Sequence, residues 1–117
     1  MEESDVMEPI YAFVRAIPSG LVVTYGQVAG SLRDVSVTAR DVGRAMQSVP
    51  SDVPWQRVVG AGGHLPIGKR SPELKMLQRK LLEAEGVGFR SETDDRVDMS
   101  RFQWITENVA DDQPSLF

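Results

Sequence analysis

The chain has 117 residues, of which 41% are hydrophobic and 26% charged, with no cysteine and a formal net charge of −4. That length suits one small globular domain, and the absence of cysteine excludes disulfides, thiolate metal sites and a cysteine nucleophile. No apolar run approaches the roughly 20 residues of a membrane-spanning helix and the acidic N-terminus is unlike a signal peptide, which predicts a cytoplasmic protein with no membrane partner.

The first predicted elements are a helix and a short strand. Apolar residues recur at helical spacing from residue 6 to residue 17, which indicates an amphipathic helix. Pro18-Ser19-Gly20 ends this helix, and residues 21–23 form a short extended run.

Two capping boxes then predict a pair of short helices. Thr24 with Gln27, and Thr38 with Asp41, have the spacing that begins a helix, and residues 33–37 form the turn between the two. This arrangement is typical of a helix-turn-helix. The second helix, which Pro50 ends, carries polar side chains off its apolar face: Arg40, Arg44 and Gln47.

The following segments predict a small hairpin and a fourth helix. Val58-Val59 and Leu65 flank a glycine-rich stretch, which indicates a hairpin or wing. Ser71-Pro72 and Gly86 are typical of the start and end of a helix. The fold class is therefore mainly α, a winged-helix-like domain with a helix-turn-helix and a small hairpin. We expect one domain over residues 1–105 and a flexible acidic tail at 106–117.

The net charge of −4 argues against a nucleic-acid partner only if the charge is summed over the whole chain, because the charge differs between segments. Residues 1–9 hold four acids and no base, and residues 91–117 hold seven acids and two arginines. Residues 10–90 hold eleven lysines and arginines against six acids, which gives +5. Because charges act over roughly 10 Å in salt, this basic body keeps nucleic-acid binding open.

Residues 53–59, Val-Pro-Trp-Gln-Arg-Val-Val, resemble the Pro-Cys-His-Arg-Val active-site motif of the O6-alkylguanine-DNA alkyltransferases. Trp55 stands where the family has its acceptor cysteine, and that replacement is typical of the alkyltransferase-like proteins. Further blocks resemble the family in the same order: Ile17–Gly20 with Val23–Ala29, Ala39–Met46, and Leu81–Gly86. The resemblance covers about residues 7–105 and identifies them as an alkyltransferase-like DNA-binding domain.

The chemistry of this motif favours a binding protein over an enzyme. Alkyl transfer needs a thiolate, which the indole of Trp55 cannot replace, so we expect no transfer. In the family's thiol-activating relay the histidine is replaced by Gln56, whereas Glu85 matches the relay glutamate. The resemblance implies a lesion pocket floored by Trp55, with Pro54, Gln56, Arg57 and Glu85 around it. The structural alternative for Trp55 is an ordinary core tryptophan.

The resemblance also implies how DNA is bound. In this family the helix-turn-helix enters the minor groove, where Tyr25 would push a phosphate and Arg40 would insert into the vacated base stack. A guanidinium can stack and hydrogen-bond in one plane, which suits that role. The remaining contacts are expected from side chains and helix N-termini on the same face: Arg44, Gln47, Thr24 and Thr38. The structural alternatives are a buried aromatic for Tyr25 and a solvated helical arginine for Arg40.

The loop from Gly60 to Arg70 departs most from the alkyltransferases. Its end could place Arg70 over a flipped purine as a cation–π partner, and an equal alternative is a solvated basic pair, Lys69-Arg70. His64 is expected to be exposed. A single histidine in a chain without cysteine makes a poor metal site, so we predict neither a metal nor a cofactor.

The C-terminal residues Gln113-Pro114-Ser115-Leu116-Phe117 resemble the pentapeptide by which many bacterial DNA polymerases and repair proteins bind the sliding clamp. Gln113 would supply a hydrogen-bonding side chain, and Leu116 and Phe117 an apolar anchor. A five-residue motif also arises by chance, so the clamp is one candidate partner.

These observations predict a non-enzymatic, monomeric sensor that flips O6-alkylguanine out of double-stranded DNA and signals nucleotide excision repair. A first alternative is a sequence-specific winged-helix transcriptional regulator without lesion recognition. A second, an enzyme acting on the flipped base, lacks a zinc ligand set and an acid placed by a motif to activate water.

Overall fold

A computed structural model describes residues 2–33 and 35–105, with side chains described from Met7 onward. The predicted clamp motif, Gln113 with Leu116 and Phe117, lies outside the described residues. The helices are α1 (Glu2–Arg15), α2 (Tyr25–Ser31), α3 (Ala39–Ala45), α4 (Pro72–Ala84) and α5 (Met99–Phe102). Short 3-10 turns are η1 (Trp55–Arg57), η2 (Ala61–Gly63) and η3 (Pro66–Lys69). The strands are β1 (Val23–Thr24), β2 (Val58–Val59), β3 (Phe89–Ser91) and β4 (Asp94–Val97).

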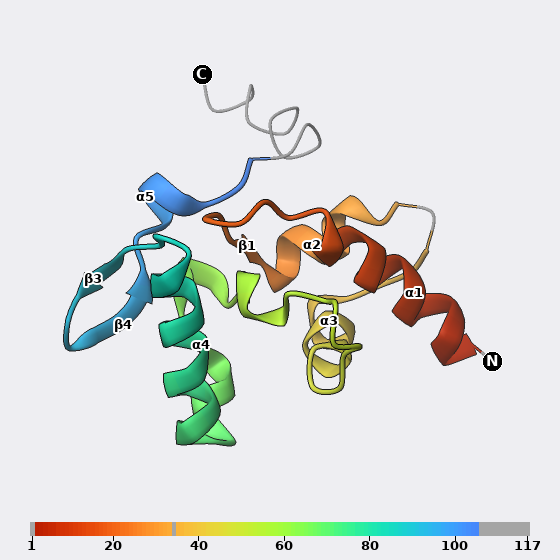
Figure 1. The fold of residues 1–117 in the computed structure, drawn as a ribbon. Coiled ribbons are helices and arrows are strands. Elements are labelled where there is room, and N and C mark those ends of the chain that lie inside the picture. Colours follow the sequence, from red (N-terminus) through yellow and green to blue (C-terminus); the bar gives the residue numbers. More distant parts are fainter. Residues whose placement is uncertain (1, 34, 106–117) are drawn as a thin grey trace.

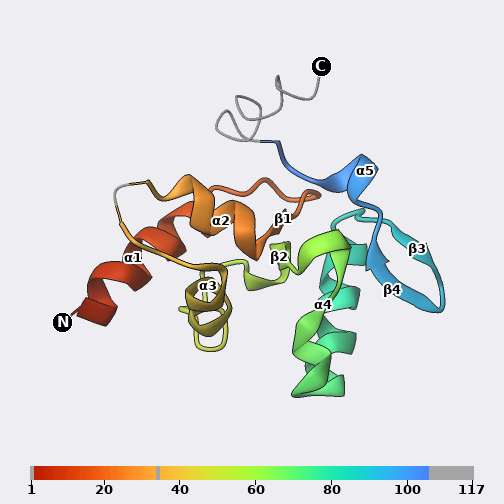
Figure 2. The same ribbon diagram turned by 180° about the vertical axis from the view of Figure 1, so that it is seen from behind.

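The mainly helical fold class is confirmed. In Figures 1 and 2, α1, α2 and α3 gather on one side of the molecule, and α4 lies with the β3–β4 hairpin on the other. Within residues 2–33 and 35–105, no helix combines the length and apolar character that crossing a bilayer requires.

The predicted helix starts at the two capping boxes are confirmed. The N–H of Gln27 donates to Thr24 Oγ1 at 3.0 Å, and the N–H of Asp41 donates to Thr38 Oγ1 at 3.1 Å. The Gln27 and Asp41 side chains accept in return from the threonine N–H groups. Both threonine side chains therefore serve as helix caps, and phosphate contact at these N-termini stays a prediction.

Two helices have bounds that differ from the prediction. α1 begins at Glu2 rather than at residue 6. α3 ends at Ala45, well before Pro50, because the chain tightens into turns there. In these turns the N–H groups of Gln47 and Ser48 bond to carbonyls three residues earlier.

The hairpin predicted between Val58-Val59 and Leu65 is wrong. β2 instead pairs in parallel with β1, with Val23 opposite Val58 and Thr24 opposite Val59. Both β2 side chains are buried, which is typical of parallel strands covered on two faces. The observed antiparallel hairpin is β3–β4, in the acidic stretch after the fourth helix.

The glycine-rich segment after β2 forms a tight turn. The N–H of Gly60 donates to the His64 carbonyl at 2.8 Å, and Gly63 has a φ of +91°, a value that favours glycine. Gly63 also approaches β4 closely. A Cβ at this position would lie 2.5 Å from the Val97 carbonyl oxygen, so no side chain fits without movement of the backbone.

β1 and β2 divide the core into two clusters. Successive strand side chains point to opposite faces, so Val23 and Val58 pack into one cluster and Val22 and Val59 into the other. The first cluster is completed by α1, α2 and α3, through residues that include Ile10, Val14, Val28 and Val42. The second is completed by Leu65, Leu82, Val87 and Val97. η1, which carries Trp55, directly precedes β2 and so lies where the two halves meet.

Candidate functional site

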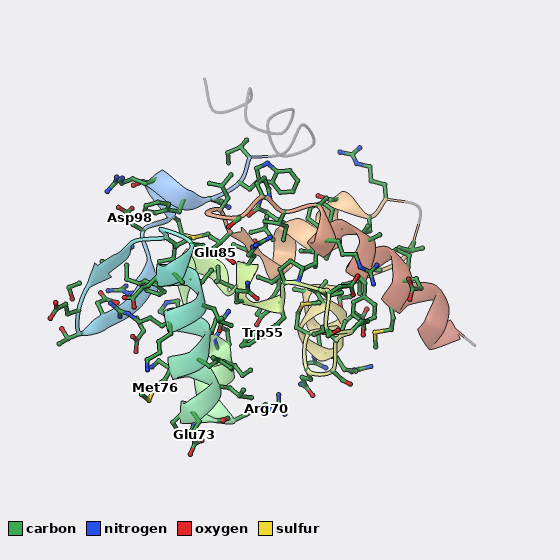
Figure 3. The ribbon with its side chains drawn as sticks, in the orientation of Figure 1. Trp55, Arg70, Glu73, Met76, Glu85 and Asp98 are labelled. Carbon is green, nitrogen blue, oxygen red and sulfur yellow. The ribbon has the colours of Figure 1, made fainter. Side chains whose placement is uncertain are left out.

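A cavity of about 710 Å³ lies among the starts of α2 and α3, η1, η3 and the first half of α4. We call it the α3–α4 cavity. Figure 3 shows Trp55 and Arg70 in this region, with Glu85 at the other end of α4. Six residues predicted for DNA or lesion binding line it together: Tyr25, Arg40, Arg44, Gln47, Trp55 and Arg70.

The two capped helices place Tyr25 and Arg40 at the cavity. Tyr25 is the first residue of α2 and is half-buried, and burial raises the pKa of its phenol, so the hydroxyl stays protonated and can donate. Arg40 is the second residue of α3 and is exposed. Gly43 follows on the same lining, and a Cβ there would meet nothing within 4 Å. The lining at Gly43 therefore borders open space.

Trp55 is held in η1 by backbone bonds. Its N–H donates to the Val53 carbonyl at 2.8 Å, and the Arg57 N–H donates to the Pro54 carbonyl at 3.0 Å. The indole packs against the first core cluster, yet it remains half-buried and lines the cavity. Trp55 is therefore a wall of the cavity as well as a neighbour of the core.

Four residues predicted for the lesion pocket lie away from this cavity. Pro54, Gln56, Arg57 and Glu85 do not line the α3–α4 cavity. Glu85, the C-cap of α4, accepts hydrogen bonds from Gln56 Nε2 at 2.8 Å and from Arg57 Nη2 at 3.0 Å. The N–H of Gly20 also donates to Glu85, at 3.3 Å. These hydrogen bonds engage the Glu85 carboxylate with Gln56, Arg57 and Gly20 rather than with the cavity.

The Glu85 cluster joins three separate parts of the chain. Arg57 Nη1 donates to the Ile17 carbonyl at 2.8 Å, so the segment after α1 is tied to η1 and to the end of α4. Burial tends to raise the pKa of Glu85, but hydrogen bonds from Arg57, Gln56 and Gly20 hold it below its ordinary value. The cluster thus fixes the turn that carries Trp55.

Sequence reasoning missed Gln78. This side chain is only 2% exposed, lines the α3–α4 cavity, and donates from Nε2 to the carbonyls of Gln56 and Val58, each at 3.1 Å. The available signal was a polar residue on the apolar side of the fourth helix, one turn before Leu82. A buried amide at such a position requires partners.

Basic side chains without acidic partners surround the cavity. Among the described residues, the ion pairs are formed by side chains that do not line this cavity, for example Arg15–Asp52, Arg57–Glu85 and Arg79–Glu83. The ion pairs of this part of the chain do not include Arg40, Arg44 or Arg70, which line the cavity. Their charge is available to an anionic ligand.

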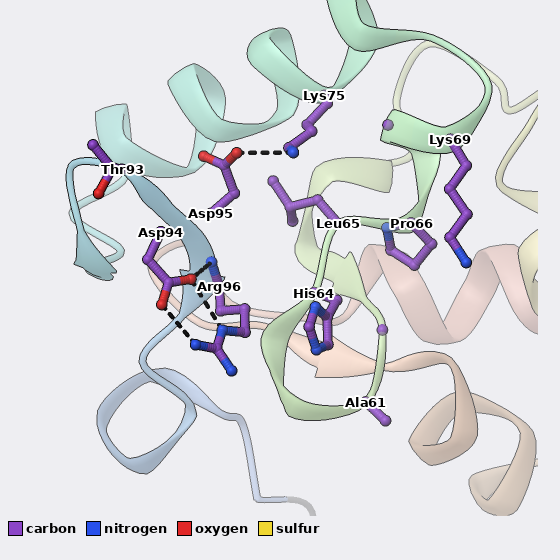
Figure 4. A pocket seen from close by; sticks show the side chains of 12 residues that line it. Ala61, His64, Leu65, Pro66, Lys69, Lys75, Thr93, Asp94, Asp95 and Arg96 are labelled. Atoms are coloured by element: carbon purple, nitrogen blue, oxygen red, sulfur yellow. Dashed lines mark hydrogen bonds and ion pairs between the residues drawn. The ribbon is translucent and has the colours of Figure 1, made fainter.

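A second cavity, of about 970 Å³, lies between the segment from Gly60 to Lys69 and β4 (Figure 4). Two pairs of its charged side chains form ion pairs, Lys75 with Asp95 at 2.9 Å and Arg96 with Asp94 at 2.8 Å. Hydrogen bonds from Arg96 lower the pKa of Asp94 to about 2. The second cavity has two carboxylates on its lining, whereas the smaller α3–α4 cavity has three arginines and no carboxylate among the described residues that line it, so the α3–α4 cavity is the better candidate for binding an anionic ligand. His64, predicted to be exposed, is exposed at this second cavity.

Comparisons with known proteins show the family to which the chain belongs. Residues 5–87 match the family described as the 6-O-methylguanine DNA methyltransferase, DNA binding domain. A DNA base-flipping protein of Escherichia coli is 36% identical over 107 residues, which cover 89% of this chain and 78% of that protein. Alkyltransferase-like protein 1 of Schizosaccharomyces pombe is 37% identical over 90 residues, 74% of this chain and 81% of that protein. The crystal structure of S. pombe Atl1 in complex with damaged DNA containing O6-carboxymethylguanine superposes with a TM-score of 0.73 and 28% identity, covering 86% of this chain and 95% of that one.

Proposed function

The chain belongs to the family of the 6-O-methylguanine DNA methyltransferase DNA-binding domain, as an alkyltransferase-like protein, and from this premise we propose its function. It binds double-stranded DNA that contains O6-alkylguanine, rotates the modified base into the α3–α4 cavity, and holds it there without removing the alkyl group.

The observation that carries this proposal is the joint placement of Tyr25, Arg40, Trp55 and Arg70 around one cavity. A base inside a duplex can be enclosed by a pocket only after it leaves the stack. Volumes of about 300–1,000 Å³ are typical of pockets for small ligands, and this one falls within that range. Tyr25 can press on a phosphate from the start of α2, and Arg40 can enter the stack from the start of α3.

The proposal assigns binding without alkyl transfer because no thiolate is available. By the resemblance of residues 53–59, Trp55 stands at the position of the acceptor, and the chain contains no cysteine. Gln56 is engaged as a donor to Glu85 and cannot act as a general base. The alkylated base therefore persists after binding, and we propose that the complex directs it to nucleotide excision repair.

A binding comparison tests the proposal directly. Short duplexes with and without one O6-methylguanine are titrated with the protein at two salt concentrations and in two sequence contexts. We expect a strong preference for the lesion in both contexts, a salt slope that counts the phosphate contacts, and full recovery of the methylated base afterwards. Indifference to the lesion together with dependence on sequence would support a transcriptional regulator, and loss of the methyl group would contradict the absence of transfer.

We also propose that residues 113–117 bind a bacterial sliding clamp. The support is the resemblance of this segment to the clamp-binding pentapeptide. A pull-down on immobilised clamp should recover the full chain and lose the variant with Leu116→Ala and Phe117→Ala, whereas Ser115→Ala serves as the matched control. Equal recovery of all three proteins would remove the clamp as a partner.

A further inference from the structure

The amide of Gln78 has a fixed orientation in the wall of the α3–α4 cavity. Its Nε2 donates two hydrogen bonds, to the backbone carbonyls of Gln56 and Val58. A carbonyl can be matched only by the NH₂ end of the amide, so both N–H groups are used and Oε1 must face away from these partners.

The oxygen of this amide faces the cavity. Among the hydrogen bonds of the described residues, none is accepted by Gln78 Oε1. Every fully buried side-chain nitrogen or oxygen among the described residues has a hydrogen-bond partner, so Oε1, which has none, must be accessible to solvent. Since Gln78 is 2% exposed and lines the α3–α4 cavity, the opening that reaches Oε1 is the cavity itself.

An acceptor at this place selects a ligand with a hydrogen-bond donor. The charged side chains on the lining, Arg40, Arg44 and Arg70, are donors only and cannot accept a proton from a base. Gln78 is a buried side chain on the lining that can accept a hydrogen bond. A ligand without a donor at this position would exclude water from Oε1 and leave the oxygen without a hydrogen bond.

We propose that Gln78 Oε1 accepts a hydrogen bond from the 2-amino group of the flipped O6-alkylguanine, which makes Gln78 a specificity-determining residue of the site. This inference rests on the proposed function. Alkylation at O6 leaves N1 without a hydrogen, so the 2-amino group is the remaining N–H donor of the base. The site then selects 2-aminopurines, and a base of similar shape without that amino group binds less well.

The test pairs a change in the protein with a change in one group of the base. The wild type is titrated with duplexes that contain O6-methylguanine, O6-methylhypoxanthine, which lacks the 2-amino group, or unmodified guanine. We expect about tenfold tighter binding of O6-methylguanine than of O6-methylhypoxanthine. The variant Gln78→Lys can still donate to the two backbone carbonyls but has no acceptor, so this ratio should fall to about one.

Two further variants separate the loss of the acceptor from the gain of a positive charge. Ala39→Lys adds the same positive charge at an exposed position of the same lining, so it controls for the added charge and should keep the tenfold ratio. Gln78→Met also removes the acceptor but adds no charge. The unfolding temperature of each Gln78 variant is measured, and a variant whose value is close to that of the wild type is folded well enough to decide the test.

The outcomes separate the two proposals. If the Gln78 variants lose affinity for both methylated bases equally and keep the wild-type ratio, Gln78 is only structural and the inference is wrong. The inference also fails, while the proposed function stands, if the wild type prefers both methylated bases equally over guanine. If the wild type does not prefer O6-methylguanine over guanine, the proposed function itself fails.

Discussion

Replacing Arg40 with alanine is expected to weaken binding of a duplex with one O6-methylguanine by about 5- to 150-fold, the range typical of a lost arginine contact to a base. Arg40 stands at the start of α3, lines the α3–α4 cavity beside Gly43, and forms no ion pair among the described residues. Its guanidinium is therefore free to enter the stack that a flipped base leaves, where stacking and planar hydrogen bonding replace the lost neighbour.

Two matched variants make this expectation specific. Arg40→Lys keeps the charge but loses the planar fork, so it should bind undamaged duplex normally and still lose affinity for the lesion. Arg90→Ala removes the same charge from the exposed β3 strand, away from the cavity lining, and should change lesion binding little.

The measurement is fluorescence anisotropy with both duplexes, together with a 2-aminopurine placed beside the lesion to report unstacking. Arg40→Ala should reduce the unstacking signal at saturating protein. An equal loss of affinity for damaged and undamaged duplexes would show that Arg40 contacts only a phosphate and that another group fills the stack.

The second large effect is on stability. Glu85→Ala should lower the free energy of unfolding by about 2–4 kcal/mol, because it leaves the guanidinium of Arg57 without its charge partner in a largely buried place. The two side chains are 17% and 14% exposed, and their separation is 3.0 Å. In a domain of this size such a loss is a large part of the total stability.

Glu83→Ala is the matched control. Glu83 lies on the same helix, pairs with Arg79 and is 49% exposed, so its loss should cost less than about 1 kcal/mol. Denaturant unfolding of both variants measures the difference, and equal values would show that the Glu85 cluster adds no stability beyond a surface ion pair.

The same cluster predicts a dependence on pH. Since hydrogen bonds hold the pKa of Glu85 below its ordinary value of 4.5, the unfolded chain takes up the proton first as the pH falls. The stabilisation is therefore complete above about pH 4.5 and is lost as the pH falls through the lower folded-state pKa. In Glu85→Gln this contribution disappears, so the stability gap between wild type and variant should narrow on acidification.

The parts of the fold that the sequence predicts correctly are local. Thr24 with Gln27 and Thr38 with Asp41 are three residues apart, so each capping box can be recognised without knowledge of the tertiary structure. The pairing of Val23 with Val58 joins residues that are distant along the chain, and local pattern contains no information about it. The apolar pair Val58-Val59 before a glycine-rich stretch is a local pattern that favours a hairpin. The predicted hairpin with Leu65 failed because the actual partner of Val58 is distant along the chain.

The candidate site divides in the same way. Trp55, which the resemblance of residues 53–59 singles out, lines the cavity together with Arg40 and Arg44 from α3, and its role toward a lesion stays a prediction. The relay resemblance implies that Gln56 lies near Glu85, and the two are joined at 2.8 Å. It does not reveal that Arg57 also binds Glu85, or that the backbone groups of Gly20 and Ile17 meet this cluster. Gln78 escaped notice because its role depends on two carbonyls that belong to a different element.

The close approach of Gly63 to Val97 links the candidate site to residues beyond the segment that the family match covers. That match ends at residue 87. Gly63, which shortly precedes the cavity residues Pro66, Ile67 and Arg70, packs so closely on β4 that no Cβ fits between the two segments. The segment after β4 binds Val22, the residue before β1: the Val22 N–H donates to the Phe102 carbonyl, and the Trp104 N–H donates to the Val22 carbonyl. One wall of the α3–α4 cavity is therefore set by residues that never touch it. The smallest fragment that could preserve the shape of the binding site must include the C-terminal hairpin and the residues up to Trp104.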